Sequence, residues 1–352
     1  MSKKLLILIF TYLLPLLLLA YLLAPIFSSK TTNAYAKISK GQPISILVVG
    51  DSIGEGQGAS KPERNFPNRL KSLLQKKYNV TASIENICMG GNTTYASYVR
   101  TYQLPNSNVF DLVIICSGEN DYEKKPGVFY EALVRTVKTK YPNAEIISVL
   151  QHSQKTYTQK IKAIQNIADH YGISTADTIP PFTNGENGDY QSLTVDNIHP
   201  NDKGYAIYAQ VLEETISANV KNHHPSPKNL PSNIFPDSLN YAVLTSIPTT
   251  SLTRTENTFT GTIDLPKTTS IKIGIELDNF KGSNSYELAV NNTKIFQKQF
   301  KWKFPQKHFI TQLAAYKPTN ATTTTQLSIT FGTQNQADSF KGFFISYPTT
   351  TN

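Results

Sequence analysis

The stretch from Ile44 to Ser52, which reads ISILVVGDS, constrains the fold of this chain more than any other. Its apolar run stops abruptly at Gly50-Asp51-Ser52. A short apolar run that ends in a turn is typical of a strand buried in a parallel sheet. In open α/β sheets the carboxyl ends of the strands form the edge at which ligands bind. The pattern therefore predicts that Ser52 lies at such an edge, where a serine is a candidate nucleophile if a base and oxyanion donors join it.

Strand-like and helix-like patterns alternate from this stretch to about residue 220. Apolar runs predict further strands at 81–88, 111–116, 144–150 and 173–176. Apolar residues at helical spacing predict helices over 66–77, 128–141, 161–171 and 205–216. Strands that alternate with helices predict a doubly wound parallel sheet with right-handed crossovers, so we expect an α/β fold.

Four positions fall where a predicted strand ends or where the last helix begins, namely Ser52, Gly91, Asn120 and His199. Because the carboxyl ends of parallel strands share one edge, we expect them to converge although they are far apart in the sequence. A serine hydroxyl needs a neighbouring base to become a nucleophile, and histidine suits that role near neutral pH. Asp196, three residues before His199, is expected to orient the imidazole and to stabilise the imidazolium.

Acyl transfer also requires donors aimed at the developing oxyanion. Three candidates are the backbone N–H groups of Ser52 and Gly91 and the side-chain amide of Asn120. Each motif also has an ordinary structural explanation: a turn at Gly-Asp-Ser, a helix cap at Asn120-Asp121, or a loop before the last helix. Their occurrence together, in this order and each at a strand end or a helix start, favours a serine-based catalytic site.

These four segments together resemble the conserved blocks of the SGNH (GDSL-type) hydrolase family. The matching segments are Gly50-Asp51-Ser52, Asn86–Thr94, Gly118-Glu119-Asn120-Asp121 and Asp196-Asn197-Ile198-His199. The resemblance covers residues 44–220 and implies a flavodoxin-like sheet, an oxyanion hole of Ser52, Gly91 and Asn120, and metal-independent ester hydrolysis or acyl transfer. Asp51 and Asp121 belong to the blocks as well, and we expect structural roles for both. No cofactor is implied.

The amino terminus carries the pattern of a membrane-directed segment. Two lysines precede a nearly unbroken apolar run from Leu5 to Phe27, which is long enough to span a bilayer. Ala34-Tyr35-Ala36 resembles a signal-peptidase site but lies several residues beyond the run. We expect residues 1–28 to be an uncleaved anchor rather than a removed signal peptide, followed by a polar tether at 29–43. Both readings place the remainder outside the cytoplasm.

Charge and cysteine usage limit the class of partner. The chain has 34 Lys and Arg against 25 Asp and Glu, a formal net charge of +9. Its basic residues are scattered and no nucleic-acid motif is present, so we expect no nucleic-acid partner and favour attraction to wall polymer or lipid headgroups. Cys88 and Cys116 fall at the ends of predicted strands that would lie two strand spacings apart, too far for a disulfide. We expect both to be small core residues.

The last third of the chain has a different pattern. Residues 221–237 contain four prolines and are predicted to be a linker. From 238 to 352 short alternating segments, such as 271–277 and 327–331, predict an antiparallel β-sandwich. Further strands are expected at 259–265, 286–290, 294–300 and 342–347. Phe300, Trp302 and Phe304 would share one strand face, either as sandwich core or as a sugar-stacking platform.

The expected protein is an extracytoplasmic, membrane-tethered serine esterase that hydrolyses acyl esters, with acetyl on a cell-surface or wall glycan as the favoured substrate and a lipid ester as the alternative. Two other functions remain open. An O-acyltransferase would use the same acyl-enzyme but exclude water and pass the acyl group to a sugar hydroxyl. A surface protein that binds glycan without catalysis would use the α/β domain as a scaffold only. A zinc-dependent deacetylase is disfavoured, because the histidines form no obvious ligand cluster in the sequence.

Overall fold

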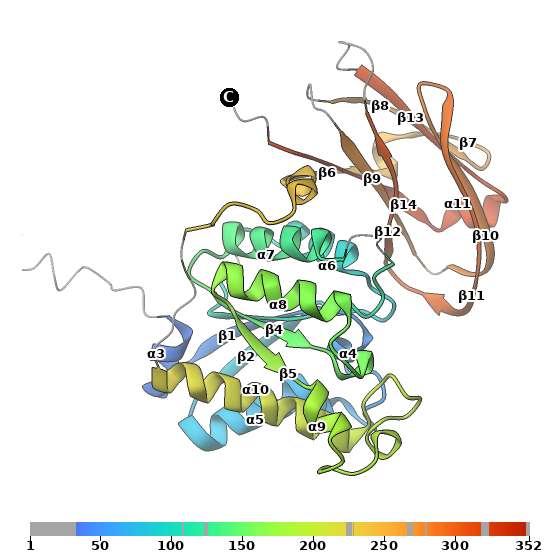
Figure 1. Ribbon diagram of the computed structural model, residues 1–352. Coiled ribbons are helices and arrows are strands. Elements are labelled where there is room, and N and C mark those ends of the chain that lie inside the picture. The colour runs from blue at the N-terminus through green and yellow to red at the C-terminus, as the bar shows by residue number, and fades with distance from the viewer. Residues whose placement is uncertain are drawn as a thin grey trace, which may run out of the picture.

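A computed structural model describes residues 33–107, 109–122, 126–222, 227, 229–265, 270–278, 280–317 and 324–349. It contains an α/β domain followed by a β domain (Figure 1). No helix of these residues is long and apolar enough to cross a bilayer. The predicted anchor at 1–28 lies outside the described residues.

The α/β domain is built on one five-stranded parallel sheet in the order β2-β1-β3-β4-β5. Its strands are β1 (Ile44–Gly50), β2 (Ala82–Asn86), β3 (Leu112–Cys116), β4 (Glu145–Leu150) and β5 (Ser174–Asp177). Its helices are α3 (Ala34–Ser39), α4 (Ser52–Glu55), α5 (Phe66–Tyr78), α6 (Thr94–Gln103), α7 (Val128–Lys140), α8 (Gln159–Tyr171), α9 (Ile179–Thr183) and α10 (Asp202–Asn222). This strand order is the flavodoxin-like one, so the expected fold class is confirmed.

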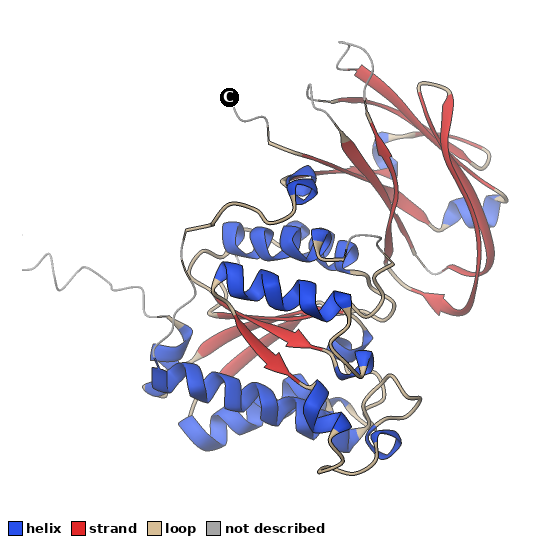
Figure 2. Ribbon diagram, viewed as in Figure 1, coloured by secondary structure: helices blue, strands red, loops and turns tan. Residues whose placement is uncertain are grey.

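Helices cover both faces of this sheet, with α6, α7 and α8 on one side and α3, α5 and α10 on the other (Figure 2). Side chains of β1 alternate between these two cores: Leu47 and Val49 pack with the first group, and Ile46 and Val48 with the second. A strand covered on both faces has no polar side, which explains the continuous apolar run that predicted it.

Two segments of the α/β domain differ from the expectations. Helix α3 lies within the expected tether, because Ala34, Tyr35 and Ile38 are buried against α5 and α10. The Tyr35 hydroxyl also accepts a hydrogen bond from Asn219 Nδ2 at 2.8 Å. Helix α6 was not predicted, since its sequence is rich in tyrosine, threonine and serine, which are weak helix formers. Tertiary burial decides its conformation.

The β domain packs two antiparallel sheets face to face, in the orders β11-β10-β13-β8-β7 and β12-β9-β14-β6. Their strands are β6 (Val243–Pro248), β7 (Thr253–Thr255), β8 (Thr258–Asp264), β9 (Ile271–Leu277), β10 (Phe280–Val290), β11 (Thr293–Gln306), β12 (Phe309–Tyr316), β13 (Thr324–Phe331) and β14 (Phe340–Tyr347). One short helix, α11 (Gln334–Asp338), joins the last two strands. The predicted antiparallel β domain is confirmed, although β6, β7 and β12 were missed. Strand β7 has only three residues, all exposed, and the proline of β6 and the two alanines of β12 are weak strand formers.

The aromatic stripe on β11 is described in part. Phe300 is half-buried and contacts Tyr286 of the sandwich core, with ring centroids 5.5 Å apart. This contact agrees with the core interpretation for Phe300. The side chains of Trp302 and Phe304 lie outside the described residues.

The two domains share a hydrophobic core. Strand β14 is apolar on both faces: Phe343 and Ile345 point into the sandwich, whereas Phe344 packs with the α/β domain. Tyr95 of α6 packs there too, and a Cβ on Gly274 of β9 would lie 2.2 Å from its hydroxyl oxygen. Gly274 is therefore needed for this close approach.

The expected linker at 221–237 is docked rather than free over its last residues. The backbone N–H groups of Ile234 and Phe235 donate to the Glu131 carboxylate of α7 at 2.6 and 2.8 Å. The following 3₁₀ helix, Pro236–Tyr241, places the Tyr241 ring 4.6 Å from the Phe129 ring. Carboxylate acceptors and aromatic packing together tie the connection to α7.

Candidate active site

The turn after β1 presents Ser52 as the first residue of α4. Gly50 allows this turn, because a Cβ there would lie 1.8 Å from the Cys116 carbonyl oxygen of β3. The Asp51 carboxylate accepts the Ile53 N–H at 3.0 Å and so caps α4. Because Ser52 opens the helix, its own N–H has no partner within the helix and is free to face a ligand.

A histidine and an aspartate from the loop before α10 meet this serine. His199 Nε2 lies 2.8 Å from Ser52 Oγ, and His199 Nδ1 lies 2.7 Å from Asp196 Oδ2. Ser52 is 6 % exposed, and the His199 side chain 14 %. With Nδ1 donating to the carboxylate, Nε2 is left to accept the serine proton. The structure thus brings together the three residues that were predicted to meet.

The loop that carries this pair is held by its own backbone. Asp196 Oδ1 accepts the N–H groups of Ile198 and His199 at 3.1 and 2.8 Å. Val195 N–H donates to the His199 carbonyl at 2.9 Å, which closes the turn. Partial burial opposes ionisation of Asp196, but the hydrogen bonds from His199 and Ile198 outweigh it and lower the pKa of this carboxyl. Asp196 is therefore a carboxylate at neutral pH.

The two further oxyanion candidates lie on neighbouring loops that are bonded to each other. Asn120 Nδ2 donates to the Asn92 carbonyl at 3.0 Å, one residue after Gly91. An asparagine amide has two N–H donors, so one remains for an oxyanion. Asn92 Nδ2 in turn donates to the Gly50 carbonyl at 3.3 Å. The loops that carry the nucleophile, the glycine and Asn120 are thus joined by hydrogen bonds.

Asp121 fixes the start of α6 rather than facing the triad. Its carboxylate accepts the Thr94 N–H at 2.7 Å and the Thr94 hydroxyl at 2.6 Å. Burial raises the pKa of Asp121, although the two hydrogen bonds from Thr94 oppose this shift. This geometry agrees with a structural role.

Residues that the sequence reasoning missed follow β4. The apolar pattern predicts a strand that ends at Leu150. The polar run Gln151–Gln154 comes next, at the same sheet edge as the other loops. Gln151 Nε2 donates to both oxygens of Asp51, at 3.0 and 2.9 Å. The signal was available, since polar residues directly after a buried parallel strand are expected at the functional edge.

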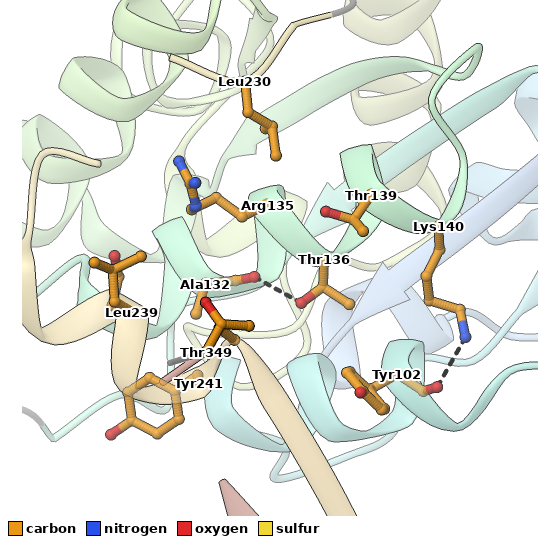
Figure 3. Close-up of a pocket in the computed structure, with 12 residues that line it drawn as sticks. Tyr102, Ala132, Arg135, Thr136, Thr139, Lys140, Leu230, Leu239, Tyr241 and Thr349 are labelled. Atoms are coloured by element: carbon orange, nitrogen blue, oxygen red, sulfur yellow. Dashed lines mark hydrogen bonds between the residues drawn. The ribbon is translucent and has the colours of Figure 1, made fainter. Parts of the chain in front are cut away.

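Other groups of interest lie elsewhere. Cys88 and Cys116 are buried free thiols, as expected. Within the described ranges, no three His, Cys, Asp or Glu side chains gather as a metal site. A cavity of about 230 Å³ lies between α6, α7 and the segment that connects the domains. Figure 3 shows Arg135, Lys140 and Tyr102 around it; neither Ser52 nor His199 lines it.

Comparison with known proteins places this site in a family. Residues 48–207 match the model of the GDSL-like Lipase/Acylhydrolase family. The fold is similar to that of a two-domain esterase active on acetylated mannans. Its structure with mannopentaose gives a TM-score of 0.72 at 16 % identity and covers 95 % of this chain and 96 % of that chain. A second structure gives 0.71 at 18 %, covering 94 % and 95 %.

A family 3 carbohydrate esterase of Clostridium thermocellum gives a TM-score of 0.45 at 15 % identity, covering 52 % of this chain and 100 % of that chain. No curated protein matched the sequence significantly. The family match spans the loops that carry Ser52, Gly91, Asn120 and His199. The α/β domain therefore matches the GDSL-like lipase/acylhydrolase family over residues 48–207, and the chain is a carboxylic ester hydrolase.

Proposed function

We propose that this protein removes small acyl groups, acetyl above all, from a cell-surface or wall glycan by serine catalysis. The observation that carries the proposal is the hydrogen-bonded chain Ser52–His199–Asp196 in a domain of an acylhydrolase family. Ser52 attacks the ester carbonyl while His199 takes its proton and passes it to the leaving alcohol. Water then hydrolyses the acyl-enzyme with His199 as the base.

Negative charge develops on the carbonyl oxygen during both steps. The N–H groups of Ser52 and Gly91 and the second amide proton of Asn120 are the proposed donors to it. The hydrogen bond from Asn120 to the Asn92 carbonyl holds this amide in place before substrate binds. Preorganised donors of this kind cost no reorganisation during the reaction.

Burial of the nucleophile supports a small acyl group. Ser52 is 6 % exposed, which leaves little open surface beside it for a long acyl chain. A glycan as the alcohol part is supported by the similarity of the whole two-domain chain to an esterase described as active on acetylated mannans.

The test measures acetate release by the full-length protein from acetylated mannan, acetylated xylan and a long-chain lipid ester. We expect turnover of an acetylated glycan that is lost in Ser52→Ala and His199→Ala. The exposed helical serine Ser72 provides the matched control, and Ser72→Ala should keep full activity. Acyl transfer to an added glycan without net hydrolysis would show that the protein is an acyltransferase rather than an esterase. Glycan binding without either reaction would contradict the catalytic proposal.

We also propose that residues 1–28 remain as a membrane anchor, with the enzyme outside the cytoplasm. Cleavage after Ala36 would remove Ala34 and Tyr35, which are buried at 0 and 1 % exposure. Helix α3 precedes β1 and lies at the sheet end opposite α4 (Figure 1), so an anchor there would leave Ser52 facing away from the bilayer.

Fractionation of cells with a mass measurement of the mature protein tests this anchor. We expect a membrane-bound chain that retains Tyr35 and is accessible to external protease. A released protein that begins at Lys37 would contradict the proposal.

A further inference from the structure

A short polar segment, Gln151–Gln154, contacts the loops on both sides of the candidate active site. It follows β4 at the carboxyl edge of the sheet, and its last three residues form a 3₁₀ helix. None of the sequence motifs that point to the triad or to the oxyanion donors includes it. Gln151 and His152 are buried, at 2 and 0 % exposure. Buried polar side chains are costly unless they are bonded, so their partners indicate what they hold.

The first contact holds the nucleophile. Gln151 Nε2 donates to Asp51 Oδ1 at 3.0 Å and to Oδ2 at 2.9 Å. Asp51 precedes Ser52 and caps its helix through the Ile53 N–H. Among the described residues, Gln151 is the one side chain that donates to this buried carboxyl. A displacement of Gln151 is therefore transmitted directly to the residue next to the nucleophile.

The second contact holds the loop of Asn120. Ser153 Oγ and Gln154 Nε2 both donate to Glu119 Oε2, at 2.5 and 2.6 Å. Glu119 directly precedes Asn120, the proposed oxyanion donor. A carboxylate that accepts two such bonds has a fixed position, and the amide next to it is oriented with it.

The middle of the segment is anchored to the helix that follows His199. His152 Nδ1 and the Tyr208 hydroxyl of α10 lie 2.7 Å apart, and the centroid of the His152 ring lies 3.9 Å from that of the tilted Phe182 ring. Aromatic packing on a fully buried ring leaves the segment little freedom to move. Its two ends are thereby held in a defined position relative to α10.

We propose that Gln151–Gln154 is a positioning element that aligns the nucleophile loop, through Asp51, with the oxyanion loop, through Glu119. Its hydrogen bonds at the site reach Asp51 and Glu119, the neighbours of Ser52 and Asn120, rather than the reacting groups themselves. The inference rests on the proposed function, because alignment affects turnover only if Ser52 is the nucleophile. Misplacement of a reacting group by about 1 Å lowers turnover on the order of a hundredfold.

Ionisation of Asp51 gives this proposal a specific signature. Burial raises the pKa of Asp51 to about 7, while the bonds from Gln151 and Ile53 favour its ionised form. Titratable groups that face it are Glu119, Asp121, Cys88, Cys116 and Tyr205. Removal of the Gln151 donor should raise this pKa further, because the ionised form loses its partner.

We therefore expect two substitutions at Gln151 to shift the pH dependence of activity in opposite directions. Gln151→Met removes the donor that holds the ionised form of Asp51. The pKa of Asp51 should rise, and the acid limb of the kcat/KM profile should move to higher pH with it. Gln151→Glu offers a proton to Asp51 only while one carboxyl of the pair stays protonated. Its activity should survive at acidic pH and fall as the pH rises, so the alkaline limb should move to lower pH. A residue with only a structural role would lower activity equally at every pH.

The experiment uses the full-length protein and p-nitrophenyl acetate. We expect kcat to fall about tenfold or more in Gln151→Met near pH 7, with KM within twofold of wild type. The double variant Ser153→Ala, Gln154→Ala removes both donors to Glu119 and should lower kcat similarly without moving the limbs. Gln159→Met makes the same substitution at an exposed position of α8 and should match wild type.

A second readout separates this proposal from the function on which it rests. A fluorophosphonate reacts with an activated serine, whose Oγ displaces fluoride from phosphorus, whether or not the natural ester is known. If wild type hydrolyses no ester but Ser52 is labelled, the labelling rates of the variants take the place of kcat. Folded variants whose rates lie within twofold of wild type, or whose losses are the same at every pH for both Gln151 substitutions, would overturn the positioning role.

Discussion

The exposure of Asp196 sets the expected cost of removing its charge. Its side chain is 49 % exposed, whereas that of His199 is 14 % exposed. Two unit charges 4 Å apart attract by about 1 kcal/mol in water and by about 4 kcal/mol at an effective dielectric constant of 20. A pair with one half-exposed partner lies between these limits, at about 2–3 kcal/mol. We therefore expect Asp196→Asn to lower kcat about 30- to 150-fold.

Asparagine is the informative substitution because it keeps one oxygen. Oδ1 can still accept the N–H groups of Ile198 and His199, so the loop should remain folded. The amide NH₂ group that replaces Oδ2 then faces His199 Nδ1 and favours the imidazole tautomer that cannot accept the serine proton, so the electrostatic loss is the lower limit of the effect. KM should stay within twofold, since no proposed substrate contact changes. Asp196→Ala removes both oxygens and should cost more, with a lower melting temperature.

The assay is p-nitrophenyl acetate hydrolysis between pH 6 and 9. The lowered pKa keeps Asp196 ionised across this window, so the wild-type carboxylate acts on His199 at every pH tested. Asp169→Asn, at an exposed site on α8, serves as the matched control. A loss below threefold, or a loss as complete as that of Ser52→Ala, would refute the electrostatic reasoning.

Three further predictions concern the oxyanion site, the domain interface and acid stability. Asn120→Ala should lower kcat about 10²- to 10³-fold, measured by steady-state kinetics, because it removes one oxyanion donor. Gly274→Val places a side chain against Tyr95 and should destabilise the protein by about 1–3 kcal/mol in urea unfolding; a wild-type midpoint would contradict the shared core. Burial lowers the pKa of His152 to about 3, so the unfolded state binds an extra proton below pH 6.5 and the unfolding free energy falls as the pH drops toward 3. His152→Gln has no titrating group at this position. The melting temperature of the variant should therefore rise relative to that of wild type as the pH is lowered from 6.5 to 4, and a difference that stays constant with pH would refute the assignment.

Local sequence determined the parts of the site that form within one segment. The run that ends in Gly50-Asp51-Ser52 specifies a buried strand followed by a sharp turn, because only apolar residues suit a strand covered on both faces. Asp196 and His199 lie on one short loop, whose backbone donates to the aspartate and brings the pair together. Their meeting with Ser52 followed from topology, because parallel strands deliver their carboxyl ends to a single edge.

The sequence indicated less where long-range burial outweighs local preference. Helix α6 has weak helix formers, and Tyr95 is buried by partners from other elements, including Phe129 of α7 and Gly274 of β9. Helix α3 reads as a tether until Tyr35 meets α10. No local pattern reveals such contacts, because their free energy depends on a partner surface supplied by another part of the chain.

By itself, the sequence determined the α/β class, the β domain, and the identity of the nucleophile, base and oxyanion candidates. The tertiary structure alone decided that Gln151 holds Asp51, that Ser153 and Gln154 hold Glu119, and that the two domains share one core. The physical reason is the distance along the chain over which each kind of interaction acts. Strand patterns and turns are encoded over a few neighbouring residues. The hydrogen bonds of the Gln151–Gln154 segment join residues 34 to 100 positions apart, and interdomain packing joins residues still farther apart, so these contacts exist only after the chain has folded.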